Sequence, residues 1–255
     1  MNTSEDSSPV LLACAHGTRD PRGQRAVAAL VAAVRDALPD TTVVDTWVDV
    51  QEPDLDSRTR ELAGRDAVVV PLLLSAGYHV FVDMARAVKA SPDHRVAAAL
   101  GPDRRLAVVL ARRLTEALRA TDAPELGERD RVVMVSAGSS DPRAGRDCEA
   151  VARLLAAELG HPVSTAYLSA AEPTLPQAVA AARTEIARLP EPSADDAAGR
   201  VLLAPYLLAP GFFHGRTLDA GADVVAQPLL VDPGEVPPEL GELVTEHYRQ
   251  APPAA

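Results

Sequence analysis

The stretch VLLACAHGTRDPRG, residues 10–23, places an apolar run directly before a histidine, a glycine and a polar turn. Residues 132–145 read VVMVSAGSSDPRAG, which is nearly the same phrase without the histidine. A short apolar run that ends at a glycine turn and leads into a helix-like stretch is typical of a buried strand in a parallel sheet. The repetition indicates that the chain contains one structural unit twice.

A similar series of apolar runs and amphipathic stretches follows each copy. We expect first-half strands at 10–15, 42–50, 67–75 and 95–100, with helices at 23–37, 54–63, 80–90 and 103–120. The strands expected after the polar segment 121–130 lie at 131–136, 162–169, 200–208 and 222–231. Such alternation predicts an α/β fold of two tandem Rossmann-like, three-layer halves with parallel sheets, related by a pseudo-twofold duplication. The expected domains are 9–120 and 131–249, joined by a linker at 121–130.

Each half serves as a control for the other. Scaffold residues recur in order, and an extra Pro- and Asp-rich segment at 189–199 accounts for the longer second copy. The side chains with ligand chemistry do not recur: His16 faces Ala137, Asp49 faces Ser169, and His79 faces Phe213, with His214 one place further on. The second half therefore kept the shape of the unit and lost its reactive groups.

His16 and His79 follow the first and third expected strands. Because the carboxyl ends of parallel strands open at the same edge of a sheet, the two imidazoles can converge on one crevice. Asp49 leaves the second strand at that edge and could either add a carboxylate or cap the next helix. Neutral imidazoles with an oxygen ligand suit Fe²⁺, Co²⁺, Ni²⁺ or Zn²⁺. Glu52 recurs as Glu172, so we expect it to be structural.

Other readings of these residues are weaker. A histidine phosphatase carries an arginine immediately before the nucleophilic histidine, and Ala15 occupies that place here. We expect Asp20, Pro21 and Arg22, which also recur, to shape the turn. The remaining histidines are expected to be solvated surface groups: His94, His161 and His247.

Composition limits the class of protein. A hydrophobic content of 47% with 3% aromatic residues is that of a globular chain with an aliphatic core. The net charge of −11 argues against a general nucleic-acid or anionic-membrane binder, although local arginines can still hold an anionic substrate. We expect Cys14 and Cys148 to be buried thiols. No signal peptide and no apolar run of membrane-spanning length are apparent, so the expected location is the cytoplasm.

Three phrases together resemble a known family, the sirohydrochlorin chelatases of the CbiX/SirB type among the class II chelatases. They are HGTRDPRG at 16–23, WVDVQEPDL at 47–55 and VVVPLLLSAGYHVFVDM at 68–84. The resemblance implies a lyase-type enzyme that inserts a divalent metal into a metal-free tetrapyrrole and releases two protons. Fe²⁺, towards sirohaem, is the first expectation. Co²⁺ for the cobalamin route and a non-catalytic metal or tetrapyrrole carrier stay open as alternatives.

The resemblance also assigns residues. His16 and His79 would form the metal-insertion site, with Asp49 as a proton outlet. Candidates for holding the carboxylated substrate are Arg19, Arg22, Arg86, Arg143, Gly77 and Tyr78. No organic cofactor is expected, and the metal ion is a substrate. Because short members of the family dimerise, this long form is expected to be a monomer with an internal pseudo-dimer.

Overall fold

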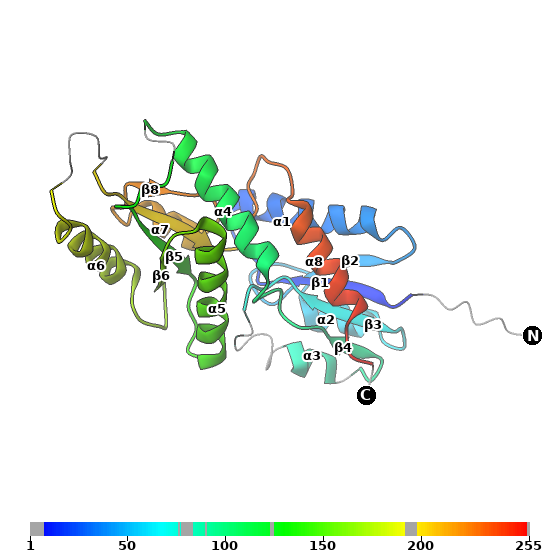
Figure 1. The fold of residues 1–255 in the computed structure, drawn as a ribbon. Coiled ribbons are helices and arrows are strands. Elements are labelled where there is room, and N and C mark those ends of the chain that lie inside the picture. The colour runs from blue at the N-terminus through cyan, green and yellow to red at the C-terminus, as the bar shows by residue number, and fades with distance from the viewer. Residues whose placement is uncertain are drawn as a thin grey trace, which may run out of the picture.

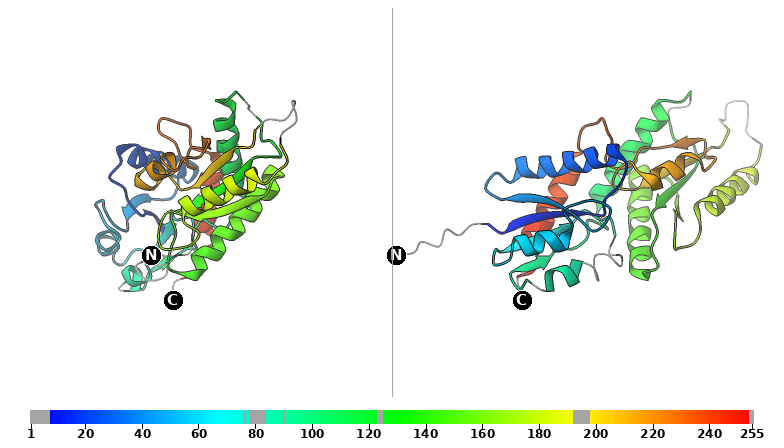
Figure 2. Two further views of the ribbon diagram at one scale, coloured as in Figure 1. Left: turned by 90° about the vertical axis from the view of Figure 1, so that its left-hand side faces the viewer. Right: turned by 180° about the vertical axis from the view of Figure 1, so that it is seen from behind.

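The computed structural model describes residues 8–75, 77, 84–89, 91–122, 125–191 and 198–253. Within these ranges the chain forms two parallel sheets in tandem, with helices packed against them (Figures 1 and 2). The elements of the first half are β1 (Val10–Ala15), α1 (Pro21–Ala37), β2 (Val43–Trp47), α2 (Leu55–Glu61), β3 (Ala67–Pro71), α3 (Ala85–Lys89), β4 (His94–Val96) and α4 (Arg104–Arg119). Those of the second half are β5 (Arg131–Ser136), α5 (Pro142–Leu159), β6 (Val163–Tyr167), α6 (Leu175–Ala187), β7 (Val201–Tyr206), α7 (Phe212–Leu218), β8 (Val224–Val225) and α8 (Pro238–Arg249). No described helix combines the length and the apolar character that crossing a membrane requires.

The predicted duplication of an α/β unit is confirmed. The strand order is β2-β1-β3-β4 in one sheet and β6-β5-β7-β8 in the other, and the strand pairs are parallel. Backbone details repeat as well: Gly17 and Gly138 both have positive φ, as do Val50 and Ala170. The two halves therefore share the conformation of their loops, not only the order of their elements.

The repeated phrase that opens each half is a strand, a turn and a capped helix. Asp20 accepts a hydrogen bond from the Arg22 amide at 2.9 Å and caps α1, whose first residue is Pro21. Asp141 caps α5 in the same way, and a proline again follows it. Proline suits this position because its missing N–H would have no partner inside the helix. The interpretation of these residues as turn-forming is thus correct.

Several predicted strands end earlier than expected. The run 42–50 stops being a strand at Trp47, and the run 67–75 stops at Pro71. The residues that continue these two runs include four apolar ones that line a cleft, namely Val50, Leu72, Leu73 and Leu74. Hydrophobicity alone cannot separate a cleft wall from a buried strand. The expectation that His94 is a surface group is wrong: it is buried in β4, and its Nε2 lies 3.2 Å from the Leu62 carbonyl oxygen.

The last helix of each half packs on the other half. Helix α4 lies against α5 and β7, while α8 lies against α1 and β3 (Figure 1). The Arg113 guanidinium donates to the Leu229 carbonyl at 3.0 Å, and the Tyr248 hydroxyl donates to the Pro9 carbonyl at 2.6 Å. One hydrophobic cluster accordingly runs through both halves. Both cysteines are buried thiols, as expected.

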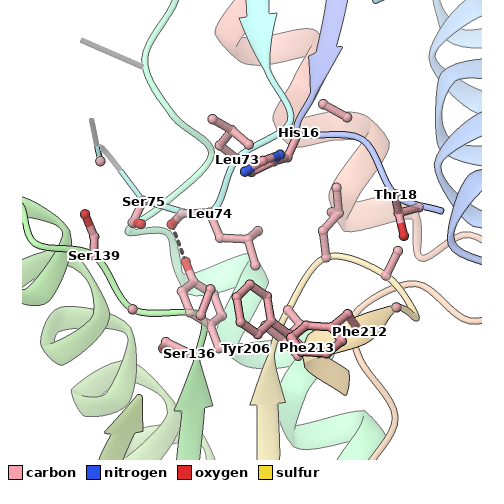
Figure 3. A pocket seen from close by; sticks show the side chains of 18 of the residues that line it. His16, Thr18, Leu73, Leu74, Ser75, Ser136, Ser139, Tyr206, Phe212 and Phe213 are labelled. Atoms are coloured by element: carbon pink, nitrogen blue, oxygen red, sulfur yellow. Dashed lines mark hydrogen bonds between the residues drawn. The ribbon is translucent and has the colours of Figure 1, made fainter. Parts of the chain in front are cut away.

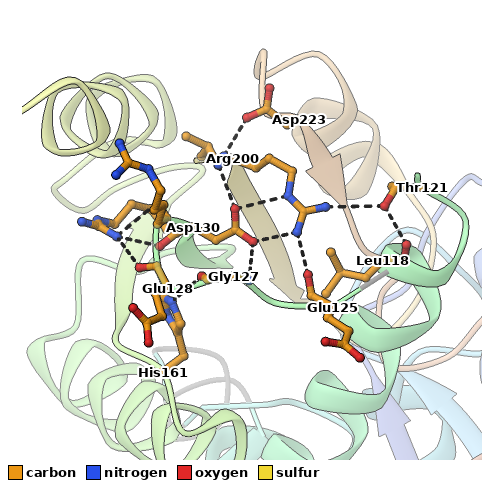
Figure 4. A network of polar contacts seen from close by, with 12 residues as sticks. Leu118, Thr121, Glu125, Gly127, Glu128, Asp130, His161, Arg200 and Asp223 are labelled. Atoms are coloured by element: carbon orange, nitrogen blue, oxygen red, sulfur yellow. Dashed lines mark hydrogen bonds and ion pairs between the residues drawn. The ribbon is translucent and has the colours of Figure 1, made fainter. Parts of the chain in front are cut away.

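A buried ion pair anchors the end of the segment between the halves (Figure 4). Arg200 Nη2 donates to Asp130 Oδ2 at 2.7 Å, and the Gly127 amide donates to the same oxygen at 2.9 Å. Burial favours the neutral form of Asp130, but these hydrogen bonds outweigh it, so the pKa of the carboxyl is lowered. The C-terminal end of the linker is therefore bound to the residue that directly precedes β7. The domain bounds 9–120 and 131–249 stay a proposal.

Candidate functional site

A cleft of about 970 Å³ lies between the two halves. Its walls come from the segments that follow β1 and β3 in the first half and β5 and β7 in the second. The carboxyl ends of both sheets thus open into one space, which is where open α/β sheets place their ligands. Most of the lining side chains are apolar or small, with a few hydroxyls and imidazoles among them.

His16 stands at the edge of this cleft, immediately after β1. Its side chain is exposed, and Figure 3 shows the ring between the two halves, close to Leu73. The turn that presents it is tight: the Asp49 amide donates to the His16 carbonyl at 3.1 Å, and Gly17 has a φ of 97°. A Cβ on Gly17 would lie 2.0 Å from the Asp49 carbonyl oxygen, so only glycine fits.

Asp49 lies beside this turn and does not belong to the described lining of the cleft. Its Oδ1 accepts from the neighbouring Val50 amide at 2.7 Å. The alternative role as a helix cap is wrong, because Asp54 caps α2 by accepting from the Ser57 amide at 2.7 Å. A role for Asp49 in proton transfer stays a prediction.

Glu52 is structural, as its recurrence indicated. Its Oε2 accepts from the Asp54 amide at 3.1 Å, and Glu172 accepts from the Thr174 amide at the same distance. Each carboxylate therefore shapes the turn before the second helix of its half. The following peptide bonds, to Pro53 and Pro173, are both cis.

The four candidate arginines differ in their surroundings. Arg19 lines the cleft. Arg22 and Arg143 form ion pairs with the aspartates that cap α1 and α5, at 2.8 and 2.7 Å, and these hydrogen bonds lower the pKa of both carboxyls. Arg86 lies exposed on α3. Of the four, only Arg19 is among the described residues of the cleft wall, and the binding roles of the others stay predictions.

The third motif is described only in part. Gly77 lines the cleft and its amide donates to the Ser75 carbonyl at 2.9 Å. Tyr78 and His79 lie outside the described residues. The convergence of His16 and His79 therefore stays a prediction.

The second half contributes an aromatic wall that the sequence analysis did not identify. Phe212 and Phe213 begin α7, with ring centroids 5.7 Å apart, and Figure 3 shows them across the pocket from His16. Phe212 is 77% exposed, more than any other large apolar side chain among the described residues. A pair of phenylalanines after a glycine, in a chain with 3% aromatics, was the available signal.

His214 also lines the cleft but differs from His16. It is buried, burial lowers its pKa, and its Nε2 has no hydrogen-bond partner. At the place that corresponds to His16, the second half has Ala137, whose carbonyl accepts from the Ser169 hydroxyl at 2.8 Å. The turn of the second half is thus closed by a local hydrogen bond. Among the described residues, no three His, Cys, Asp or Glu side chains gather as a metal site.

Comparison of the sequence with models of known families identifies the family of this chain. The family model CbiX matches residues 10–117 and again 131–230, one match for each half. The chain belongs to the CbiX family. A search of curated protein sequences gives no match.

Solved structures share the CbiX-family fold along nearly the whole chain. SirB from Bacillus subtilis with Fe³⁺ is 19% identical, with a TM-score of 0.70 and 95% of each chain covered. The sirohydrochlorin chelatase SirB from B. subtilis subspecies spizizenii in complex with cobalt is 17% identical, with a TM-score of 0.70 over 95% of this chain and 94% of that one. CbiX, described as the terminal enzyme for biosynthesis of siroheme in denitrifying bacteria, is 18% identical, with a TM-score of 0.64 over 94% and 98%. At this identity the likeness establishes the fold.

Proposed function

We propose that this CbiX-family protein inserts a divalent metal ion, Fe²⁺ in the first place, into sirohydrochlorin. The observation that carries the proposal is an exposed imidazole, His16, at the edge of a large apolar cleft between two sheets. Related folds include a sirohydrochlorin chelatase in complex with cobalt and a terminal enzyme of siroheme biosynthesis. A cobaltochelatase of the cobalamin route is the alternative that keeps the reaction and changes the metal.

The cleft suits a flat, partly apolar macrocycle. Its volume of about 970 Å³ is near the upper end of ordinary small-molecule sites, which run from about 300 to 1,000 Å³. Phe212 and Phe213 offer apolar surface on one side, and Leu73 and Leu74 offer it on the other. A macrocycle between these walls would present its central nitrogens to the space that His16 enters.

The reaction needs a base and a labile metal ligand. When M²⁺ enters the ring, two N–H protons leave, and the metal exchanges its former ligands for the ring nitrogens. A neutral imidazole can bind the metal loosely or accept one of the protons, and the exposed position of His16 at the cleft edge supports either role. His79 and Asp49 are proposed as the partner ligand and the proton outlet.

The carboxylates of the substrate require local cations, because the chain as a whole carries a net charge of −11. Arg19 is the arginine whose side chain lines the described part of the cleft. Its guanidinium can hold a carboxylate bidentately. We propose Arg19 as the first contact for a substrate carboxylate, with Arg22, Arg86 and Arg143 as outer contacts.

Initial rates with Fe²⁺, Co²⁺ and Ni²⁺ on sirohydrochlorin, measured anaerobically and corrected for the spontaneous reaction, test the proposal. An enzyme converts many equivalents of the tetrapyrrole, whereas a carrier changes the absorbance of about one equivalent at most. His16→Ala should remove most of the activity, and His247→Ala is the control because that imidazole lies on α8, bonded to the Ala98 carbonyl. Single-equivalent behaviour of the wild-type protein with all three metals would reject the enzymatic proposal.

A further inference from the structure

The carbonyl of Leu74 is held from the opposite half of the molecule. Tyr206 is the last residue of β7, and its hydroxyl donates to the Leu74 carbonyl oxygen over 2.6 Å (Figure 3). The phenol is almost fully buried, at 3% exposure, although the residue also borders the cleft. Burial raises the pKa of Tyr206 well above its usual value, so the hydroxyl keeps its proton and stays a donor.

The corresponding carbonyl of the second half is satisfied locally. Leu208 corresponds to Leu74, and its carbonyl accepts from the Leu230 amide at 2.8 Å. In the first half, the residue that corresponds to Tyr206 is Leu72, which has no hydroxyl to offer across the cleft. The hydrogen bond from Tyr206 to the Leu74 carbonyl therefore has no counterpart from Leu72 to the Leu208 carbonyl.

A second residue that differs between the two halves, Gly101, lies against the Tyr206–Leu74 hydrogen bond. Leu73 and Leu207, the residues that precede Leu74 and Leu208, each accept a hydrogen bond from a leucine amide. The Leu100 amide donates to the Leu73 carbonyl and the Leu229 amide donates to the Leu207 carbonyl, each within 3.0 Å. The residue after Leu229 is Leu230, but the residue after Leu100 is Gly101. A Cβ on Gly101 would lie 2.3 Å from the Leu74 oxygen and also 2.3 Å from the Tyr206 hydroxyl. Glycine leaves the space that the Tyr206 hydroxyl needs.

We propose that Tyr206 is a positioning residue, through which the second half fixes the cleft wall at Leu73–Ser75 for metal insertion. This wall lies close to His16, and in the sequence it leads to His79. The inference rests on the proposed function for its catalytic consequence. Its structural part, the anchoring of the wall from across the cleft, can be measured separately.

Tyr206→Phe removes only the hydroxyl, and Tyr248→Phe is a matched control. The Tyr248 hydroxyl also donates to a first-half carbonyl, that of Pro9, and also at 2.6 Å, but before β1 at the far end of the sheet. Both variants lose one buried hydrogen bond and should lose similar stability. Only Tyr206→Phe should speed amide hydrogen exchange at residues 72–75, by about fivefold. Gly101→Ala, which intrudes on the same bond from the other side, should have the same local effect.

Metal insertion then tests the consequence. Tyr206→Phe should lower kcat about tenfold with little change in KM for sirohydrochlorin, because a displaced wall misplaces reacting groups. Tyr248→Phe should keep the wild-type kcat. Unchanged exchange at residues 72–75 in Tyr206→Phe, or faster exchange with a normal kcat, would overturn the inference. If the wild-type protein inserts no metal, the proposed function fails and the exchange comparison alone decides whether Tyr206 anchors the wall.

Discussion

Replacing Gly17 with alanine should destabilise the protein and also impair the site, whereas the same change at Gly138 should only destabilise it. Gly17 has a φ of 97° and Gly138 a φ of 89°, a region that costs a residue with a side chain about 1–2 kcal/mol. An added Cβ would lie 2.0 Å from the Asp49 oxygen in the first half and 1.8 Å from the Ser169 oxygen in the second. Moving a packed backbone out of the way costs a further 1–3 kcal/mol or so.

Each variant should therefore lose roughly 2–5 kcal/mol of the free energy of unfolding, against a total of about 5–15 kcal/mol for a typical domain. With a urea m-value of about 3 kcal/mol per molar, the unfolding midpoint should fall by about 1 M. The midpoint is measured by far-UV circular dichroism. Both variants should still be folded without denaturant, so their activities can be compared.

Gly17→Ala and Gly138→Ala should differ in their rates of metal insertion. In the first half, the carbonyl that must move belongs to Asp49, and the Asp49 amide donates a hydrogen bond to the His16 carbonyl. A shift of Asp49 should therefore displace the backbone of His16 and with it the imidazole. In the second half, the displaced Ser169 faces Ala137, which has no reactive group. We expect Gly17→Ala to lower the rate of metal insertion well below that of Gly138→Ala at equal stability loss. A wild-type midpoint in Gly17→Ala, or equal activity loss in both variants, would refute the reasoning.

Three further outcomes are expected. His16→Ala should lose most insertion activity while its unfolding midpoint stays near that of the wild type, because the side chain is exposed; His214→Ala should affect activity less. Asp130→Asn should lower the free energy of unfolding by about 3–5 kcal/mol at neutral pH, because it removes the carboxylate charge that forms the buried ion pair with Arg200. This loss should shrink in acid, where wild-type Asp130 takes up a proton at its lowered pKa. Burial lowers the pKa of His214, so near pH 6.5, the reference pKa of histidine, the unfolded state binds a proton more readily than the folded state. Wild-type stability should therefore fall as the pH drops through about 6.5, and the stability of His214→Gln should fall less steeply. Urea titrations across pH check the last two.

The fold could be predicted because its signal is local and repeated. The bounds of β1 and β5 agree with the apolar runs at 10–15 and 131–136, since a strand buried on both faces is a continuous apolar run with sharp ends. The runs at 42–50 and 67–75 were read as longer strands than they are. Val50 in the first run and residues 72–74 in the second line the cleft, and an apolar cleft wall gives the same sequence pattern as a buried strand.

The partners of elements far apart in the sequence could not be predicted. Nothing in the amphipathic pattern of 104–119 says that α4 covers the second sheet while α8 covers the first. The burial of His94 could not be predicted for the same reason, because its ring lies against the Leu62 carbonyl, which follows α2 and is far away in the sequence. Position after a strand was enough to place His16 at the cleft, because the topology of a parallel sheet fixes where strand ends meet.

The asymmetry between the halves has two parts, of which only one was predicted from the sequence. Loss of the imidazole at Ala137 was visible by comparing the copies, and it suggested a second half kept for its shape. The other part is a hydrogen bond that only the second half supplies. Tyr206 and Gly101 both differ from the corresponding residues of the other half, and both lie at the Leu74 carbonyl. A half that supplies a hydrogen bond to the wall opposite cannot vary freely, even without reactive groups of its own. In our proposal the retained histidine turn therefore depends on a partner sheet that has specialised in holding its cleft in shape.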